Sequence, residues 1–268
     1  MALIGVFDSG VGGLSILDEA LRQLPQHDYI YLADSANAPY GEKSSDWIAV
    51  RSMFLCKYLA NNGCDAIVIA CNTATAEAIK HIRAELDIPI VGVEPGIKPA
   101  AMQTQNGIVG VLATEATLKS DKFSALLATL PENCQVIKQS GAGLVSLIEA
   151  GKADSEDALE LLGQHLAPIL DAGADTLVLG CTHYPFLRKA IRKLLGDSIT
   201  LVDTSDAVVR QLKRQVESLH QVMPSQDRGT VMFISSKDES SLLAMAKDLM
   251  FSDLQSHSIS SKQLGEIA

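Results

Sequence analysis

Short apolar runs alternate with longer amphipathic stretches along most of the chain. Runs of about four to seven apolar residues bounded by polar or small residues predict buried strands, and the stretches between them have helical periodicity. Such alternation is typical of parallel strands joined by helices, so the pattern predicts an α/β fold with mostly parallel sheets flanked by helices. The predicted strands span residues 3–7, 29–33, 66–70, 90–93, 107–113, 134–138, 176–180, 199–202 and 230–234.

Two stretches of the chain repeat one pattern. The segments "CDAIVIACNTATAEAI", from Cys64, and "ADTLVLGCTHYPFLRKAI", from Ala174, both run from a small residue and Asp through four apolar residues to a small residue, Cys and a helix. Cys71 and Cys181 hold the same place in this repeat, roughly 110 residues apart, which is too long a period for a solenoid. The repeat predicts two similar α/β lobes, each with one thiol.

The expected domain boundaries follow from the chain length and from Pro and Gly residues that interrupt the helical and strand patterns. A chain of 268 residues has room for one or two domains. Pro95, Gly96 and Pro99 interrupt the pattern near the middle, where the chain could leave the first lobe. It could return to the first lobe after "LVDTSDA". We therefore expect a first lobe of residues 1–96 with 208–268, and a second lobe of residues 97–207.

Chemically useful side chains follow several predicted strands. Cys71 and Cys181 each end an apolar run, as do Asp8, Asp34 and Thr114. Ligands of open parallel sheets bind beyond the carboxyl ends of the strands, where helix N-termini present unpaired N–H groups. Two lobes facing each other would enclose an interlobe cleft with a thiol on either wall and N–H donors suited to carboxylates.

Charge and composition narrow the class of protein. The chain has 22 Lys and Arg against 32 Asp and Glu, a net charge of −10, which argues against nucleic acid or an anionic membrane as a partner. The start "MALIGVFDSG" lacks the basic and apolar regions of a signal peptide, and no apolar stretch reaches the ~18 residues of a membrane span. We expect a cytoplasmic protein. Its five cysteines show no CxxC spacing and should be reduced thiols.

Simpler interpretations exist for most of these residues. Cysteine is among the most buried residue types, and Cys56, Cys64 and Cys134 are expected to be core or surface residues without a chemical role. His183, two residues after Cys181, could be an ordinary loop histidine or a metal ligand. The ligand set is too sparse to favour a metal site.

The turn "DSGVGG" suggests a nucleotide-binding loop at first sight. However, Ser15 stands where the GxGxxG fingerprint needs its third glycine, and no GK[ST] follows. The turn is better interpreted as a flexible loop that presents Asp8 and Ser9 to a small anion.

Several motifs together resemble those of a known family. In order and spacing, "FDSGVGGLS", "YLADSANAPYGEK", "VIACNTATA", "GVLAT" with Thr117, "LIEAG" and "LGCTHYP" are similar to the signatures of the aspartate/glutamate racemase family. The resemblance covers about residues 3–205 and is weaker after about Leu219. It implies a cofactor-independent interconversion of L- and D-glutamate that supplies D-glutamate for peptidoglycan, without a metal. It also leaves a homodimer open.

The repeat of strand-end thiols fits this reaction. Inversion at Cα without a cofactor needs one group to remove a proton from one face and another to deliver a proton to the opposite face. A free cysteine titrates near 8.5, so a working base needs a helix N-terminus or a neighbouring group that favours the thiolate. By the resemblance, Cys181 deprotonates L-glutamate and Cys71 deprotonates D-glutamate. Asp8 would assist Cys71, and His183 with Glu149 would assist Cys181.

The resemblance also implies a set of residues that hold glutamate. Their hydroxyl, amide and backbone N–H groups are reasonable partners for two carboxylates, and Asp8 could alternatively bind the ammonium group. The set is Asp8, Ser9, Tyr40, Gly41, Asn72, Thr73, Thr114, Thr117, Thr182 and His183.

Three alternatives remain open. A cysteine hydrolase would use one thiol with a histidine and would leave the second strand-end thiol unexplained. A non-catalytic module for small anions would need neither thiol. Within the family, aspartate is the nearest rival substrate, because it differs by one methylene, worth only about 1 to 3 kcal/mol in an apolar pocket. The glutamate-type motifs favour glutamate.

Overall fold

The computed structural model describes residues 1–219, 228–250, 254 and 257–264. All nine predicted strands are present, with bounds that differ by one or two residues at most. The chain divides into unit 1, Met1–Val93 with Ser205–Ala268, and unit 2, Glu94–Thr204. Each unit contains a parallel sheet flanked by helices, which confirms the predicted fold class. Part of the segment that follows Leu219, residues 220–227, lies outside the described residues.

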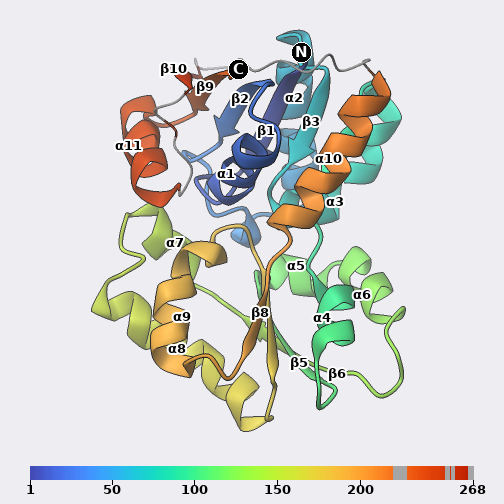
Figure 1. Ribbon diagram of the computed structural model, residues 1–268, viewed down its shortest axis with the longest axis vertical. Helices are drawn as coiled ribbons and strands as arrows, with labels where there is room; N and C mark the ends of the chain where they lie inside the picture. Colours follow the sequence, from blue (N-terminus) through green and yellow to red (C-terminus); the bar gives the residue numbers. More distant parts are fainter. Residues whose placement is uncertain (220–227, 251–253, 255–256, 265–268) are drawn as a thin grey trace. The chain divides into compact units, whose positions relative to one another are not determined.

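The sheet of unit 1 places three functional strand ends side by side. In its described part the strand order is β10-β9-β2-β1-β3-β4, with every pair parallel. The strands are β1 (Leu3–Asp8), β2 (Asp28–Ala33), β3 (Ala66–Ile69), β4 (Ile90–Gly92), β9 (Thr230–Ser235) and β10 (Ser258–Gln263). Phe7 of β1 lies opposite Leu32 and Ile69, so that β2, β1 and β3 end at the same edge (Figure 1).

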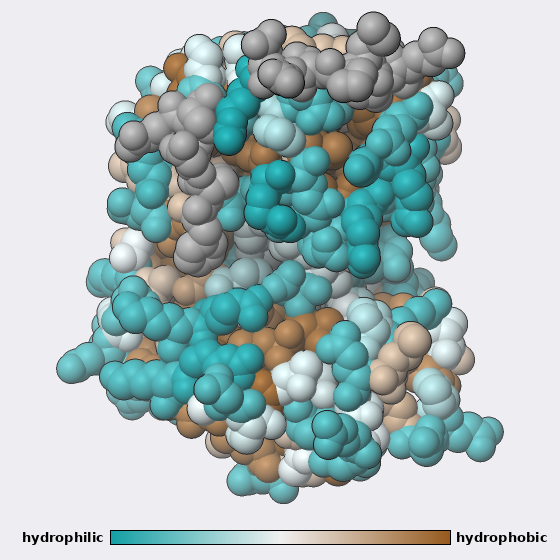
Figure 2. Space-filling view, viewed as in Figure 1, coloured by the Kyte–Doolittle hydropathy of each residue, from teal (hydrophilic) through white to brown (hydrophobic). Residues whose placement is uncertain are grey.

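Helices cover the sheet of unit 1 in two packed pairs. Helix α2 packs on α3, and α1 packs on α10. The helices are α1 (Leu14–Gln23), α2 (Ser45–Asn61), α3 (Asn72–Glu85), α10 (Ser205–Leu219) and α11 (Glu239–Leu249), with a 3₁₀ turn η1 at Tyr40–Glu42. The outward face of α10 is hydrophilic (Figure 2), whereas its Val208, Val209, Leu212 and Val216 are buried. Helix α10 is therefore amphipathic, with one face in the core.

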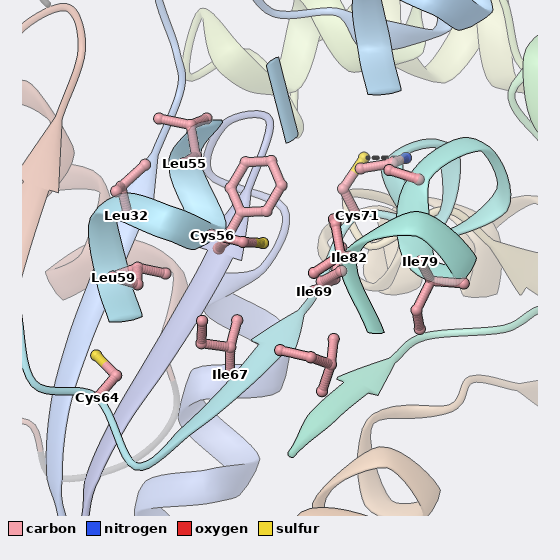
Figure 3. Close-up of a cluster of buried hydrophobic side chains, with 14 of the residues drawn as sticks. Leu32, Leu55, Cys56, Leu59, Cys64, Ile67, Ile69, Cys71, Ile79 and Ile82 are labelled. Atoms are coloured by element: carbon pink, nitrogen blue, oxygen red, sulfur yellow. Dashed lines mark hydrogen bonds between the residues drawn. The ribbon is translucent and has the colours of Figure 1, made fainter. Parts of the chain in front are cut away.

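A buried apolar cluster joins β3 to α2 and α3. Figure 3 shows Ile67 and Ile69 of β3 near Leu59 of α2 and Ile79 of α3. Full burial of such a side chain contributes about 1.5 to 3 kcal/mol, so the cluster holds the end of β3 firmly against the start of α3. Cys71 lies at that junction.

Strand β10 was not predicted from the sequence. Its residues "SISSKQ" are mostly polar and exposed, and Ile259 alone among them is half-buried. It is an edge strand that pairs with β9. An edge strand that buries little apolar surface leaves no hydrophobic pattern to detect.

Unit 2 is a smaller version of the same arrangement, with strand order β6-β5-β7-β8. Its strands are β5 (Ile108–Ala113), β6 (Gln135–Ser140), β7 (Thr176–Gly180) and β8 (Thr200–Val202). Its helices are α4 (Ile97–Gln103), α5 (Glu115–Lys119), α6 (Asp121–Leu127), α7 (Leu144–Glu149), α8 (Glu156–Asp171) and α9 (Arg188–Leu195), with a 3₁₀ turn η2 at Tyr184–Leu187. Its core packs Ile97 of α4 and Phe123 of α6 against Val111 and Val178 of the sheet.

The aspartate of the sequence repeat has a structural role in both units. Asp65 accepts a hydrogen bond from the backbone N–H of Leu3 at 2.8 Å. Asp175 accepts hydrogen bonds from the Thr104 hydroxyl at 2.6 Å and from the N–H groups of Gln105 and Asn106 at 2.7 and 2.9 Å. Burial alone would raise the pKa of Asp175, but these hydrogen bonds lower it to about 2. Each carboxylate thus ties the start of its strand to a neighbouring segment.

We expect Asp175→Asn to lower the free energy of unfolding at pH 7 by about 1 to 2 kcal/mol, since several bonds to a charged but partly exposed acceptor are weakened. The folded-state pKa lies below the ordinary value of about 3.9, so this stability is present above pH 4 and is lost as the pH falls toward about 2. Urea unfolding of parent and variant across this range measures the effect, with the exposed Asp171→Asn as control. A difference that does not shrink with falling pH would contradict the assignment.

Candidate functional site

The loop after β1 is tightly packed around Asp8. The Asp8 side chain is completely buried, and its Oδ1 accepts a hydrogen bond from the N–H of Gly10 at 2.8 Å. The Tyr31 hydroxyl donates to the carbonyl of Gly10 at 2.7 Å. A Cβ on Gly13 would lie 2.8 Å from Cβ of Asp8 and 2.9 Å from Cβ of Ala70, so only glycine fits there. The last glycine of "DSGVGG" therefore allows the start of α1 to approach Asp8 closely.

Cys71 caps the N-terminus of α3. It follows β3 in extended conformation, and its Sγ accepts a hydrogen bond from the N–H of Ala74 at 3.4 Å (Figure 3). Ser, Thr, Asp or Asn usually occupies this capping position. The thiol is buried, with 5% of the residue exposed. The partial positive charge of a helix N-terminus stabilises a negative sulfur at this place.

Asn72 and Thr73 open the same helix and are both buried. The Nδ2 atom of Asn72 has no hydrogen-bond partner in the described part of the chain. A buried amide donor without an acceptor is costly, by about 1 to 3 kcal/mol. The Asn72 amide is therefore available to an anionic ligand beside Cys71. Ser9, after β1, is also buried.

Tyr40 belongs to the same buried cluster as Cys71, but its hydroxyl proton is already engaged. The hydroxyl donates to Oδ2 of Asp34 at 2.6 Å. Burial and then the charge of Asp34 raise the pKa of Tyr40, and the charge of Cys71 adds to the rise. Tyr40 and Gly41 begin the η1 turn, so their N–H groups have no acceptor within that turn. Backbone N–H groups are what this segment can offer to a carboxylate.

Asp34 and Arg51 were missing from the predicted set of site residues. Arg51 of α2 donates through Nε and Nη2 to the two oxygens of Asp34, at 2.9 and 2.7 Å. Burial alone would raise the pKa of Asp34, but hydrogen bonds from Arg51 and Tyr40 outweigh it and hold the pKa below its ordinary value. A signal was present in the sequence, because Asp34 ends a buried strand and needs a cation. Arg51 lies among the apolar residues Ile48 and Leu55 of the following helix.

In unit 2, Cys181, His183 and Glu149 form a chain of contacts. Cys181 follows β7, and its Sγ lies 3.7 Å from Nδ1 of His183. Nε2 of His183 lies 2.6 Å from Oε1 of Glu149, the last residue of α7. Burial alone would lower the pKa of His183, but the bonds to Cys181 and Glu149 raise it well above its ordinary value. A protonated His183 stabilises negative charge on the Cys181 sulfur.

Tyr184 follows His183, and its backbone N–H donates to the carbonyl of Cys181 at 3.0 Å. Its ring is fully buried, and its hydroxyl donates to the carbonyl of Gly141 at 3.2 Å. A Cβ on Gly141 would lie 2.3 Å from the Tyr184 hydroxyl oxygen, so a side chain there would displace the ring. Burial, and the charge of Cys181, raise the pKa of Tyr184, which keeps the phenol protonated.

The remaining predicted residues of unit 2 gather at the ends of β5 and β7. Thr114 caps α5, and its hydroxyl donates to Oγ1 of Thr117 at 2.9 Å. Thr182 lies between Cys181 and His183 in the sequence, and it is buried. Because Ala113 lies opposite Gly180 in the sheet, these hydroxyls and the Cys181 thiol lie at one edge.

The structure therefore places the predicted site residues in two groups. Unit 1 carries Asp8, Ser9, Tyr40, Gly41, Cys71, Asn72 and Thr73. Unit 2 carries Thr114, Thr117, Glu149, Cys181, Thr182 and His183. Each group lies around the strand ends of its own unit.

The other three cysteines lie in the cores, although all five are free thiols. Cys56 and Cys64 belong to the apolar cluster around β3, and burial raises the pKa of each to about 12. Cys134 is half-buried against the core of unit 2. These three thiols are poorly placed for acid–base chemistry.

The described part of the chain holds neither a metal-ligating cluster nor a membrane-spanning helix. Within residues 1–219, 228–250, 254 and 257–264, no group of three or more His, Cys, Asp or Glu side chains could hold a metal ion. No helix in these ranges is both long enough and apolar enough to cross a membrane.

Relatives of this chain carry similar sequences over most of their length. The glutamate racemase of Ralstonia nicotianae is 51% identical over 249 residues, covering 93% of this chain and 90% of the relative. The glutamate racemase of Cupriavidus pinatubonensis is 50% identical over 262 residues, covering 96% of this chain and 95% of the relative.

The solved structures that resemble this chain include glutamate racemases, as do the sequence relatives. Glutamate racemase RacE1 of Bacillus anthracis is 29% identical with a TM-score of 0.86, covering 99% of this chain and 98% of that one. Escherichia coli glutamate racemase, solved with L-glutamate and the activator UDP-MurNAc-ala, is 34% identical with a TM-score of 0.83, covering 98% of this chain and 99% of that one. The family model described as Asp/Glu/Hydantoin racemase matches residues 4–212. The chain belongs to the Asp/Glu/Hydantoin racemase family.

Proposed function

We propose that this protein is a glutamate racemase that interconverts L- and D-glutamate without a cofactor, with Cys71 and Cys181 as its two acid–base groups. Family membership and about 50% identity to curated glutamate racemases support the reaction and the isomerase class. The observation that carries the mechanism is the presence of one strand-end thiol in each unit, each beside groups that favour negative sulfur.

The proposed proton transfers balance without another reactant. The Cys181 thiolate removes the Cα proton of L-glutamate, which leaves a carbanion stabilised by the adjacent carboxylate. The Cys71 thiol then delivers its proton to the opposite face of Cα. The product is D-glutamate, with Cys181 protonated and Cys71 ionised, and exchange of protons with solvent restores the starting state. The mechanism requires both thiols to reach opposite faces of the same carbon.

Each thiol has its own means of carrying negative charge. At Cys71 these are the N-terminus of α3 and, by the proposal, proton transfer to or from Asp8. At Cys181 the contact with His183, which is in turn bound to Glu149, fills the same role. General acid–base groups of this kind contribute about 10²- to 10⁴-fold to a rate.

The remaining residues of the predicted set would bind the substrate. The unpartnered Nδ2 of Asn72 and the N–H groups of the η1 turn suit one carboxylate, and the Thr114, Thr117 and Thr182 hydroxyls suit another. The carboxylate of Asp8 could alternatively bind the ammonium group. Hydrogen bonds of this kind hold Cα in place and leave its proton accessible to sulfur.

The cellular role follows from the product. We propose that the enzyme works in the cytoplasm and supplies D-glutamate for peptidoglycan synthesis. The net charge of −10 supports a small-molecule substrate over nucleic acid or an anionic membrane.

One observation favours a second function. The contacts from Cys181 through His183 to Glu149 also suit a cysteine hydrolase, which uses a thiol, a base and an orienting carboxylate. A hydrolase would need Cys181 but not Cys71. Hydrolysis of an activated thioester by Cys71→Ala at the parent rate, with no racemisation by the parent, would support this alternative.

The proposed reaction can be tested with the purified protein. After exhaustive dialysis against a chelator and with no cofactor added, the optical rotation of L-glutamate should decay to zero. L-aspartate should react more slowly, by about 10- to 200-fold for the missing methylene. Activity that is lost on dialysis and restored by a metal, or a faster reaction with aspartate, would contradict the proposal.

A further inference from the structure

Asp34 and Arg51 form an ion pair next to the Tyr40 hydroxyl, and the Asp34 carboxylate has several hydrogen-bond donors. Asp34 is fully buried and receives two hydrogen bonds from Arg51, one from Tyr40 and two contacts from the Asn37 amide, at 3.1 and 3.2 Å. Its oxygens are therefore fully used within the protein. Although Asp34 follows β2 at the same sheet edge as Asp8 and Cys71, it is not available to a ligand.

The carboxylate instead orients one side chain. Tyr40 is held at its hydroxyl by Asp34, and its ring packs on Trp47 and Phe7, with ring centroids 5.2 and 6.3 Å away. The Trp47 contact is edge-on, at 86°. The ring is thus restrained at its tip and along its sides. Arg51, with 21% of its side chain exposed, is the charged group that keeps Asp34 ionised.

We propose that Asp34 and Arg51 are positioning residues that fix Tyr40, and with it the Tyr40–Glu42 turn, which packs on α3, the helix that Cys71 caps. This inference rests on the proposed function, because the turn matters only if its N–H groups bind glutamate. Arg51 acts through Asp34, and Asp34 acts through Tyr40. A misplacement of about 1 Å in a binding group can change catalysis by as much as 10²-fold, so a remote ion pair can control the affinity for substrate.

The test compares Arg51→Met with a matched control. Arg51→Met keeps much of the aliphatic stem but removes both bonds to Asp34. Arg83→Met removes a guanidinium of the same unit that donates to the carbonyl of Ile90, away from the turn. We expect Arg51→Met to raise KM for glutamate at least about tenfold, Arg51→Lys to recover part of the loss, and Arg83→Met to keep the parent KM. A purely structural role would reduce the amount of folded enzyme and leave KM unchanged.

Trp47 provides a second readout that does not depend on turnover. It is the single tryptophan of the chain and lies against Tyr40, so displacement of Tyr40 should change its fluorescence in Arg51→Met but not in Arg83→Met. If the parent does not racemise glutamate, the proposed function fails, and the Trp47 comparison still decides whether the ion pair positions Tyr40. If Arg51→Met does not fold, Tyr40→Phe removes the bond to Asp34 alone and should change KM and fluorescence in the same direction. Parent-like KM and fluorescence in the folded variant would overturn the inference.

Discussion

Alanine at either Cys71 or Cys181 is expected to lower glutamate racemisation by at least about 10³-fold in both directions. Each thiol supplies or accepts one of the two protons that inversion requires, so the loss of one stops the reaction even when the other thiol is intact. Polarimetry with each enantiomer measures the effect. Serine at the same positions should be nearly as inactive, because a hydroxyl is a far weaker acid than a thiol.

The control for this experiment is another thiol of the chain. Cys134 is half-buried in unit 2 and lies outside the proposed site, so Cys134→Ala should retain activity within about twofold. Thermal unfolding and Trp47 fluorescence with glutamate show whether the inactive variants still fold and bind. A Cys71→Ala or Cys181→Ala enzyme that racemised at nearly the parent rate would end the proposal.

Replacement of the groups next to the thiols should have the next largest effect. We expect His183→Asn and Asp8→Asn each to slow turnover by about 10²-fold or more, since each is assigned to one thiol. The two enantiomers have equal free energies, so kcat/KM must fall equally for both. Because each group serves one thiol, each variant should lower kcat more in one direction than in the other. The value of kcat depends on the step that limits each direction.

Two further variants sharpen this prediction. Glu149→Gln removes the carboxylate at 2.6 Å from His183 and should lose activity in the same direction as His183→Asn, by a smaller factor. His165 bonds to the carbonyl of Ala142, outside the proposed site, so His165→Asn should stay within about threefold of the parent. Equal losses of kcat in the two directions would also agree with these roles, because one step can limit the rate in both directions. Full activity in both His183→Asn and Asp8→Asn would rule out their roles.

The buried strands could be predicted from the sequence because they are apolar on both faces. Runs such as 66–69 and 176–180 have every residue buried in the structure. Polar strand β10 could not be predicted in this way, since its hydrogen bonds to β9 leave no apolar signal. The apolar pattern reveals strands that carry apolar residues, including the edge strands β4, β6 and β8, and misses the polar edge strand β10.

The repeat of "DAIVIACNT" and "DTLVLGCTH" contained more information than a thiol at each strand end. The aspartates at its start, Asp65 and Asp175, tie neighbouring segments at the amino ends of their strands. Cys71 and Cys181 lie at the opposite ends. Sequence position alone predicted where the thiols lie, because the carboxyl end of a parallel strand is a defined place in the fold.

Side-chain contacts between separate segments of the chain could not be predicted from the sequence. Asp34 follows a strand, Tyr40 lies in a turn and Arg51 in a helix. Only the folded chain shows that Tyr40 and Arg51 both donate to the Asp34 carboxylate. The close approaches at Gly13 and Gly141 are of the same kind. A glycine in a loop predicts flexibility as readily as close packing, and the choice depends on neighbours that are remote in sequence.

The two-base mechanism is tested most directly by racemisation in deuterated water. With two distinct thiols, the proton delivered to Cα comes from the thiol that has already exchanged with solvent. The first D-glutamate formed from L-glutamate should therefore carry deuterium at Cα almost completely, while unreacted L-glutamate remains largely protiated. Mass spectrometry of the separated enantiomers at low conversion gives both values. Substantial protium in the first product would mean that a single base had carried the same proton across, and would contradict the mechanism.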